Sequence, residues 1–98
     1  TSAWRGKPDF SGFAPTKAAQ RILAEAMARE LGPKGVHVAY VVIDAVIDLR
    51  WTRKRFPDLP DERFAKTEAI AETVYQVAHQ DPGAWSFNVE LRPAGEVW

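Results

Sequence analysis

The 98-residue chain contains no cysteine, so no disulfide can stabilise it and no thiolate can act as a nucleophile or metal ligand. This absence fits a cytoplasmic protein. No apolar run approaches the ~20 residues of a membrane span, and the first residues lack the basic and apolar segments of a signal peptide. The formal net charge is zero, which argues against binding to nucleic acid or to a membrane surface through bulk charge.

Helical and strand-like patterns alternate along what is one small domain. One stretch, "VHVAYVVI", is apolar on both alternating faces, as in a strand covered on both sides of a parallel sheet. Another, "WSFNVEL", alternates between apolar and polar residues, as in a strand with one covered face. The expected elements are a loop over 1–10, a helix over 11–31, a strand over 36–43, a lid-like loop over 45–64, a helix over 67–79 and a strand over 85–91.

The order of these elements predicts the sheet. The final strand–helix–strand unit is expected to form a right-handed parallel crossover. Two strands alone do not make a stable sheet, and the strand over 36–43 has few neighbours within the chain. The sequence therefore predicts an α/β fold in which residues 1–98 form a single segment, the C-terminal part of a Rossmann-like doubly wound parallel sheet.

A lysine stands at the start of the first helix, four residues after an aromatic ring, in the stretch "FAPTK". Together with the continuation "AAQRILAEAMARELGPKGVHVAYVVIDAVID", this stretch resembles the C-terminal part of the short-chain dehydrogenases/reductases. Their hallmark is a tyrosine, three residues and then a lysine at the start of a long helix. The end of the chain is similar to a subgroup with a terminal "W…V.LRP…E.W" pattern, here running from Trp85 to Trp98.

The resemblance implies roles for three residues. Lys17 corresponds to the family's lysine, which binds the nicotinamide ribose and lowers the pKa of the catalytic tyrosine. Phe13 occupies the tyrosine position and has no proton to give, so the usual general acid is missing. Ile47 lies where family members contact the nicotinamide amide. Thr1 or Ser2 could stand in for the family's catalytic serine, and neither is assigned.

The cofactor implied for a longer parent protein is NAD or NADP. The six glycines do not form the glycine-rich dinucleotide loop, so no cofactor is expected to bind this chain alone. The two lone histidines have no second ligand at metal spacing, so no metal site is expected.

Three other features of the sequence each have more than one interpretation. Asp44 and Asp48 follow the strand over 36–43 and could serve acid–base chemistry or a turn and helix start. The basic run over 50–55 could bind a phosphate or nucleic acid, or form a solvated face of a helix or lid. The alanine-rich face of the first helix could be core or a helix-packing interface.

The resemblance implies the C-terminal fragment of an NAD(P)-dependent oxidoreductase, which transfers hydride between a nicotinamide and a small carbonyl or alcohol. The fragment is expected to be inactive alone. The alternative is a non-catalytic pseudo-reductase or oligomerisation module. In either case the chain is expected to form a homodimer or higher oligomer, because its two strands need further covering layers and lateral partners.

Overall fold

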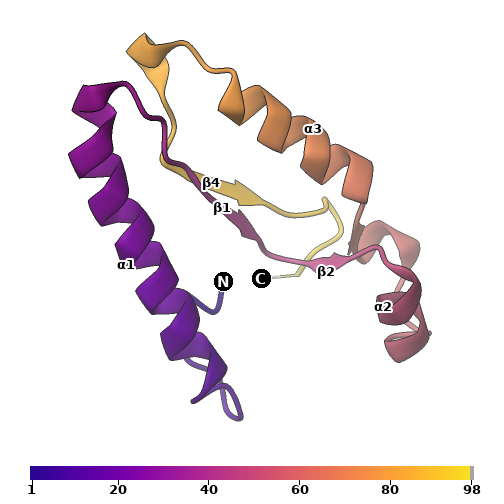
Figure 1. Cartoon of the computed structure of the whole chain (residues 1–98). Helices are drawn as coiled ribbons and strands as arrows, with labels where there is room; N and C mark the ends of the chain where they lie inside the picture. The colour runs from indigo at the N-terminus through magenta and orange to yellow at the C-terminus, as the bar shows by residue number, and fades with distance from the viewer. Residues whose placement is uncertain (98) are drawn as a thin grey trace.

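The computed structural model describes residues 1–97, and Trp98, the last position of the C-terminal pattern, lies outside them. Helices and short strands alternate along the chain (Figure 1). The elements in order are helix α1 (Phe13–Leu31), strands β1 (Tyr40–Ile43) and β2 (Val46–Ile47), helix α2 (Arg50–Arg55), strand β3 (Phe64–Ala65), helix α3 (Thr67–Ala78) and strand β4 (Asn88–Leu91). Single 3-10 turns cover Gly32–Lys34, Asp61–Arg63 and Pro82–Ala84. Among residues 1–97, no helix combines the length and the apolar character needed to cross a bilayer.

The central sheet is the parallel pair β1–β4, in the register Tyr40 to Asn88 and Ile43 to Leu91. It runs between α1 and α3, so the β1–α3–β4 crossover joins parallel strands as the sequence predicts (Figure 1). A second parallel pair, β2–β3, continues beyond the carboxyl end of β1. The mixture of helices and parallel strands is compatible with part of a Rossmann-like sheet.

Both central strands are shorter than expected, because other hydrogen bonds engage the backbone at their amino ends. Gly35 adopts a left-handed φ of 83°, and the Val36 amide donates to the Leu31 carbonyl at 3.1 Å, which closes α1. At the other strand, the Ser86 amide donates to the Gln80 side chain at 2.8 Å. Ladder pairing therefore begins at Tyr40 and Asn88, not at residues 36 and 85.

Helix α1 turns its small side chains toward the rest of the chain. Ala14 is buried, and Ala18, Ala24 and Ala28 are half-buried. Ile22 and Leu23, by contrast, are each 61% exposed. The alanine-rich face thus contacts this chain's own layer, and the larger apolar side chains of α1 remain uncovered within residues 1–97.

The segment predicted as a lid-like loop over 45–64 is instead a folded unit containing β2, α2 and the first residue of β3. The prediction was wrong because two-residue strands carry no detectable alternation. Phe64 and Ala65, at 3% and 8% exposure, are among the most buried residues of the chain.

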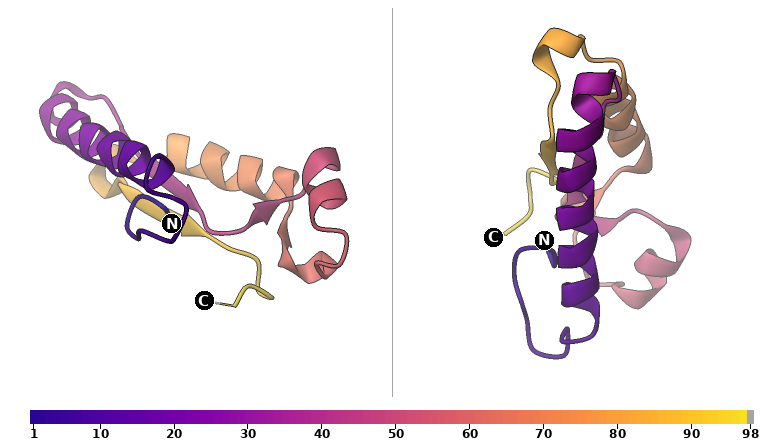
Figure 2. Two further views of the ribbon diagram at one scale, coloured as in Figure 1. Left: turned by 90° about the horizontal axis from the view of Figure 1, so that it is seen from below. Right: turned by 60° about the vertical axis from the view of Figure 1, so that its left-hand side comes forward.

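The whole molecule is open in shape. Its radius of gyration is 15.4 Å, whereas a compact domain of this length has about 13 Å (Figure 2). Its accessible surface is 7085 Å², against about 5600 Å² for a compact monomer of the same mass. The surface excess means that much apolar area remains uncovered.

The C-terminal tail is fixed against the segment before β3. A Cβ on Gly95 would lie 2.8 Å from the Glu62 Cγ and 2.9 Å from the Glu62 carbonyl oxygen, so the backbones approach as only glycine permits. Next to this contact, Arg63 pairs with Glu96 at 2.8 Å. The two contacts join the tail to the β2–β3 region.

Candidate functional site

Phe13 and Lys17 lie one turn apart at the start of α1 and face each other. The Lys17 Nζ is 5.4 Å from the centroid of the Phe13 ring, within cation–π range. The same Nζ donates to the Gln20 Oε1 at 3.4 Å. Phe13 is 52% exposed and makes an edge contact with Phe10 at 6.0 Å between centroids. The i, i+4 spacing therefore brings the two predicted catalytic positions together.

Both residues line a cleft of about 540 Å³ that follows the free edge of β1. The Tyr40 hydroxyl, also in this cleft, donates to the Lys17 carbonyl at 3.4 Å and ties α1 to β1. The complete lining is Thr1, Ser2, Ala3, Phe13, Lys17, Gln20 and the residues 39–43. The two hydroxyl residues considered for the catalytic serine role thus lie in the same cleft as Lys17.

Ile47 lies apart from this cleft. It belongs to β2, where it pairs with Ala65 of β3. Its carbonyl accepts a hydrogen bond from the Thr52 hydroxyl at 2.6 Å, and the next amide, of Asp48, donates to the Ala65 carbonyl at 2.8 Å. Within residues 1–97 the structure therefore joins Phe13 with Lys17 and leaves Ile47 outside their cleft.

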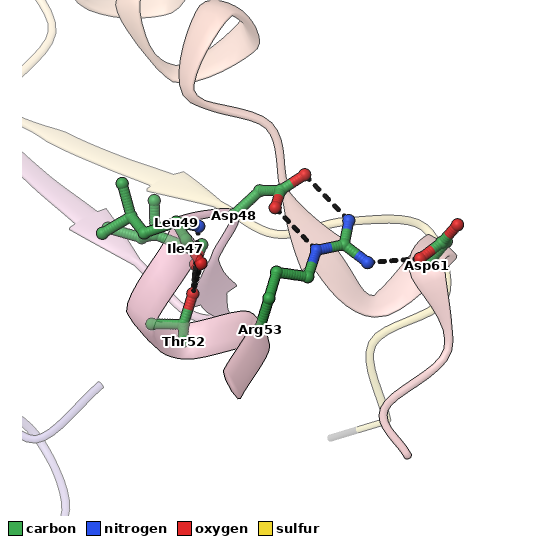
Figure 3. A network of polar contacts seen from close by, with 6 residues as sticks. All are labelled: Ile47, Asp48, Leu49, Thr52, Arg53 and Asp61. Carbon is green, nitrogen blue, oxygen red and sulfur yellow. Dashed lines mark hydrogen bonds and ion pairs between the residues drawn. The ribbon is translucent and has the colours of Figure 1, made fainter. Parts of the chain in front are cut away.

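Asp48 and Arg53 form a two-pronged ion pair in the β2–α2–β3 region (Figure 3). The Arg53 Nε and Nη2 donate to the two Asp48 oxygens at 2.7 and 2.8 Å, and Nη1 donates to Asp61. The Arg53 guanidinium, by hydrogen-bonding the carboxylate, lowers the pKa of Asp48. The same hydrogen bonds raise the pKa of Arg53. A carboxyl with a lowered pKa is a poor general acid near neutral pH, so the pairing favours the structural interpretation of Asp48.

Asp44 is also paired. It directly follows β1, and its carboxylate accepts from Arg92, which directly follows β4, at 3.2 Å. Arg5 approaches the same oxygen at 3.9 Å. The pair connects the carboxyl ends of the two parallel strands, the edge at which open α/β sheets bind ligands.

The two histidines each stack on an aromatic ring. His37 stacks on Trp85 with centroids 4.8 Å apart, and its Nε2 lies 2.8 Å from the Ser86 carbonyl oxygen. His79 stacks on Tyr75 at 4.1 Å. In the described part of the chain, no group of three or more potential ligands is arranged to hold a metal ion.

The sequence patterns did not identify Thr52 and Arg53, whose side chains join α2 to its neighbouring segments. Thr52 is the one buried polar residue found among residues 1–97, at 4% exposure. Its hydroxyl also accepts from the Leu49 amide at 3.0 Å, as a side chain at the third helical position does in a capping box. The recognisable signal was a threonine as the third residue of a helix, three positions after its N-cap Leu49.

This site belongs to an α/β structure in which a helix with an aromatic–lysine pair lies beside a parallel sheet and lines a cleft with β1. No family model and no curated protein matches the chain. A solved structure does: a short-chain dehydrogenase from Rhodopseudomonas palustris, with 33% sequence identity and a TM-score of 0.68 over 94% of this chain. The chain spans about a third, 34%, of the length of that structure. The match supports a relation to the short-chain dehydrogenases.

Proposed function

We propose that the chain is the C-terminal section of a short-chain oxidoreductase that uses NAD or NADP and acts on a small carbonyl or alcohol. The observation that carries the proposal is the Phe13–Lys17 pair in a cleft beside β1, within a fold similar to a short-chain dehydrogenase. Lys17 is the residue that would bind the nicotinamide ribose, and Phe13 would form a wall of the site. Within residues 1–97, β1 pairs with β4 alone, and this pairing and the open shape support the view that further strands complete the fold.

The residues of this chain fit one end of a dinucleotide and not the other. Lys17 lines the cleft, and its amine is a suitable hydrogen-bond donor to a ribose. Phosphate binding in such folds uses a strand, a glycine-rich turn and a helix N-terminus. Helix α1 follows a loop, and its N-cap Gly12 follows no strand. No chemical step through the cofactor follows from the described residues alone.

The first prediction is that NADH and NADPH do not saturate the 98-residue chain below about 1 mM, because one ribose contact supplies too little binding free energy. Fluorescence titration of the chain, and of a longer protein containing it, provides the measurement. Saturation of both at micromolar concentration would contradict the proposal that this section lacks the phosphate-binding part. Absence of binding by the longer protein would instead favour the pseudo-reductase.

The pseudo-reductase or oligomerisation module is the second candidate, and Phe13 is the observation that favours it. A ring without a hydroxyl can shape a cleft and cannot donate a proton. The exposed apolar side chains of α1 suit either candidate, since both would associate through this helix.

The second prediction is that the chain forms at least a dimer in solution, because Ile22 and Leu23 on α1 leave apolar surface exposed. Light scattering at micromolar concentration measures the mass. Leu23→Lys is expected to raise the dimer dissociation constant by at least about tenfold, since it puts an unpaired charge in an apolar seam. Gln76→Lys adds the same charge at an exposed site on α3 and is the control. A monodisperse 11.0 kDa species for the unmodified chain would contradict the prediction.

A further inference from the structure

The unit formed by β2, α2 and β3, residues 46–65, contains its own buried residues. Three of its residues, Thr52, Phe64 and Ala65, are less than a tenth exposed. Segments that open easily have few buried apolar contacts and backbone hydrogen bonds exposed to solvent. The burial within this unit therefore requires an explanation other than gating.

Arg53 makes contacts that reach all parts of the unit. It holds Asp48, directly after β2, through two hydrogen bonds, and Asp61, before β3, through a third (Figure 3). Its guanidinium carbon also lies 3.9 Å from the centroid of the buried Phe64 ring. The planar guanidinium can make a forked pair with a carboxylate and stack on a ring at once, which a lysine cannot.

Helix α2 is thereby joined to the backbone that leaves β2, which is itself bonded to β3. The Asp48 amide donates to the Ala65 carbonyl at 2.8 Å, so the carboxylate that Arg53 holds belongs to a backbone already joined to β3. The Thr52 hydroxyl fixes the preceding carbonyl, of Ile47. Arg53 thus acts on the position of Ile47 through Asp48.

We propose that Arg53 is a positioning residue, which holds the β2–α2–β3 unit as a preformed wall and fixes the exit of β2 at Ile47. The unit accordingly does not open and close as a lid. The effect of Arg53 on a nicotinamide bound near Ile47 rests on the proposed function. The rigidity of the β2–α2–β3 unit does not rest on it.

The proposal requires that protonation of Asp48 weakens the unit. Asp48 faces Arg53, and Lys66 acts on it through space, while Asp61 shares the same guanidinium. The pKa of Asp48 is lowered in the folded state. Its contribution to stability is therefore present above the unfolded value of about 3.9 and is lost as the pH falls through the lowered folded value. Between pH 5 and 8 the unit is expected not to respond to pH.

The third prediction concerns amide hydrogen exchange of the 98-residue chain followed by NMR. Two sets of amides are compared: Asp48, Arg53 and Phe56 report on the unit, and Tyr40 and Asp44 report on the β1–β4 pair. Arg53→Ala is expected to speed exchange in the unit by at least about threefold relative to the β1–β4 amides. Asp48→Asn and Arg53→Lys should act in the same direction, because neither keeps the charged two-pronged pair.

The matched control is Lys54→Ala, which removes the same charge from the next, exposed position of α2. Equal exchange in the Arg53→Ala and Lys54→Ala proteins would overturn the proposal. An equal loss of protection in both sets of amides would also overturn it, since it would show a general and not a local role. Fast exchange of the unit in the unmodified chain, with a protected β1–β4 pair, would show that the segment is a mobile lid after all. None of these outcomes depends on cofactor binding or turnover, so they are independent of the proposed function.

Discussion

Replacing Phe13 by tyrosine is expected to raise carbonyl reduction by the complete oxidoreductase that we propose by about 10²–10⁴-fold, the usual contribution of general-acid catalysis. The ring already faces the cleft, and the Lys17 amine lies 5.4 Å from its centroid. A hydroxyl at the ring's end would lie in the field of this ammonium, which favours the ionised phenol and lowers its pKa. Steady-state turnover on a panel of ketones and aldehydes measures the gain.

Phe10→Tyr is the matched control for this fourth prediction. The Phe10 and Phe13 rings make an edge contact with their centroids 6.0 Å apart. Phe10 lines a different cleft, between the first residues and α1. The control adds a hydroxyl of the same kind nearby without placing it beside Lys17. A similar rate change in both variants would contradict a specific role for position 13. No gain with any substrate would favour the pseudo-reductase, in which the rest of the site is also altered.

The long helices were predictable from sequence because their signals are local and repeated. The α1 pattern extends over five turns and ends at Gly32-Pro33, and the i, i+4 spacing of Arg21, Glu25 and Arg29 gives ion pairs at 3.3 and 2.8 Å. The expected α3 differs from the observed one by a single residue at its end. The parallel pairing of the two main strands also followed from the intervening helix.

The β2–α2–β3 unit was not predictable in this way, because its contacts are not periodic. Arg53 pairs with residues five positions before it and eight after it, and neither spacing belongs to a helix-surface pattern. The sequence of a basic run does not distinguish solvated side chains from side chains in ion pairs. Only the turn before β3 brings Asp61 back to Arg53.

The candidate site was predictable in one part only. Phe13 and Lys17 come together because four residues make one helical turn. The position of Ile47 depends on how the chain turns after β1. At this turn Asp44 pairs with Arg92, which is distant in the sequence. Such long-range pairing fixes where the backbone leaves the sheet and leaves no mark on the local sequence.

The fifth prediction is that Thr52→Val lowers the free energy of unfolding by about 2–4 kcal/mol, a large part of the 5–15 kcal/mol typical of a domain. Valine keeps the branched shape of threonine, so packing changes little. The loss comes from the hydroxyl, which donates to the Ile47 carbonyl at 2.6 Å and accepts from the Leu49 amide at 3.0 Å. At 4% exposure, water cannot replace it, and both backbone groups lose a partner.

Thr73→Val provides the comparison, with unfolding by urea as the measurement. The Thr73 hydroxyl donates to the Ala69 carbonyl at 3.1 Å, at an exposed hydrogen bond within α3 where the helical amide and water also satisfy that carbonyl. The same atoms are removed in both variants, and only the buried site is expected to show a loss above about 0.5 kcal/mol. Thr52→Ser, which keeps the hydroxyl, should recover most of the stability. If Thr52→Val and Thr73→Val unfold at the same urea concentration, the hydroxyl does not hold α2 against β2, and the Arg53 contacts and the packing of Phe64 and Ala65 maintain the unit without it.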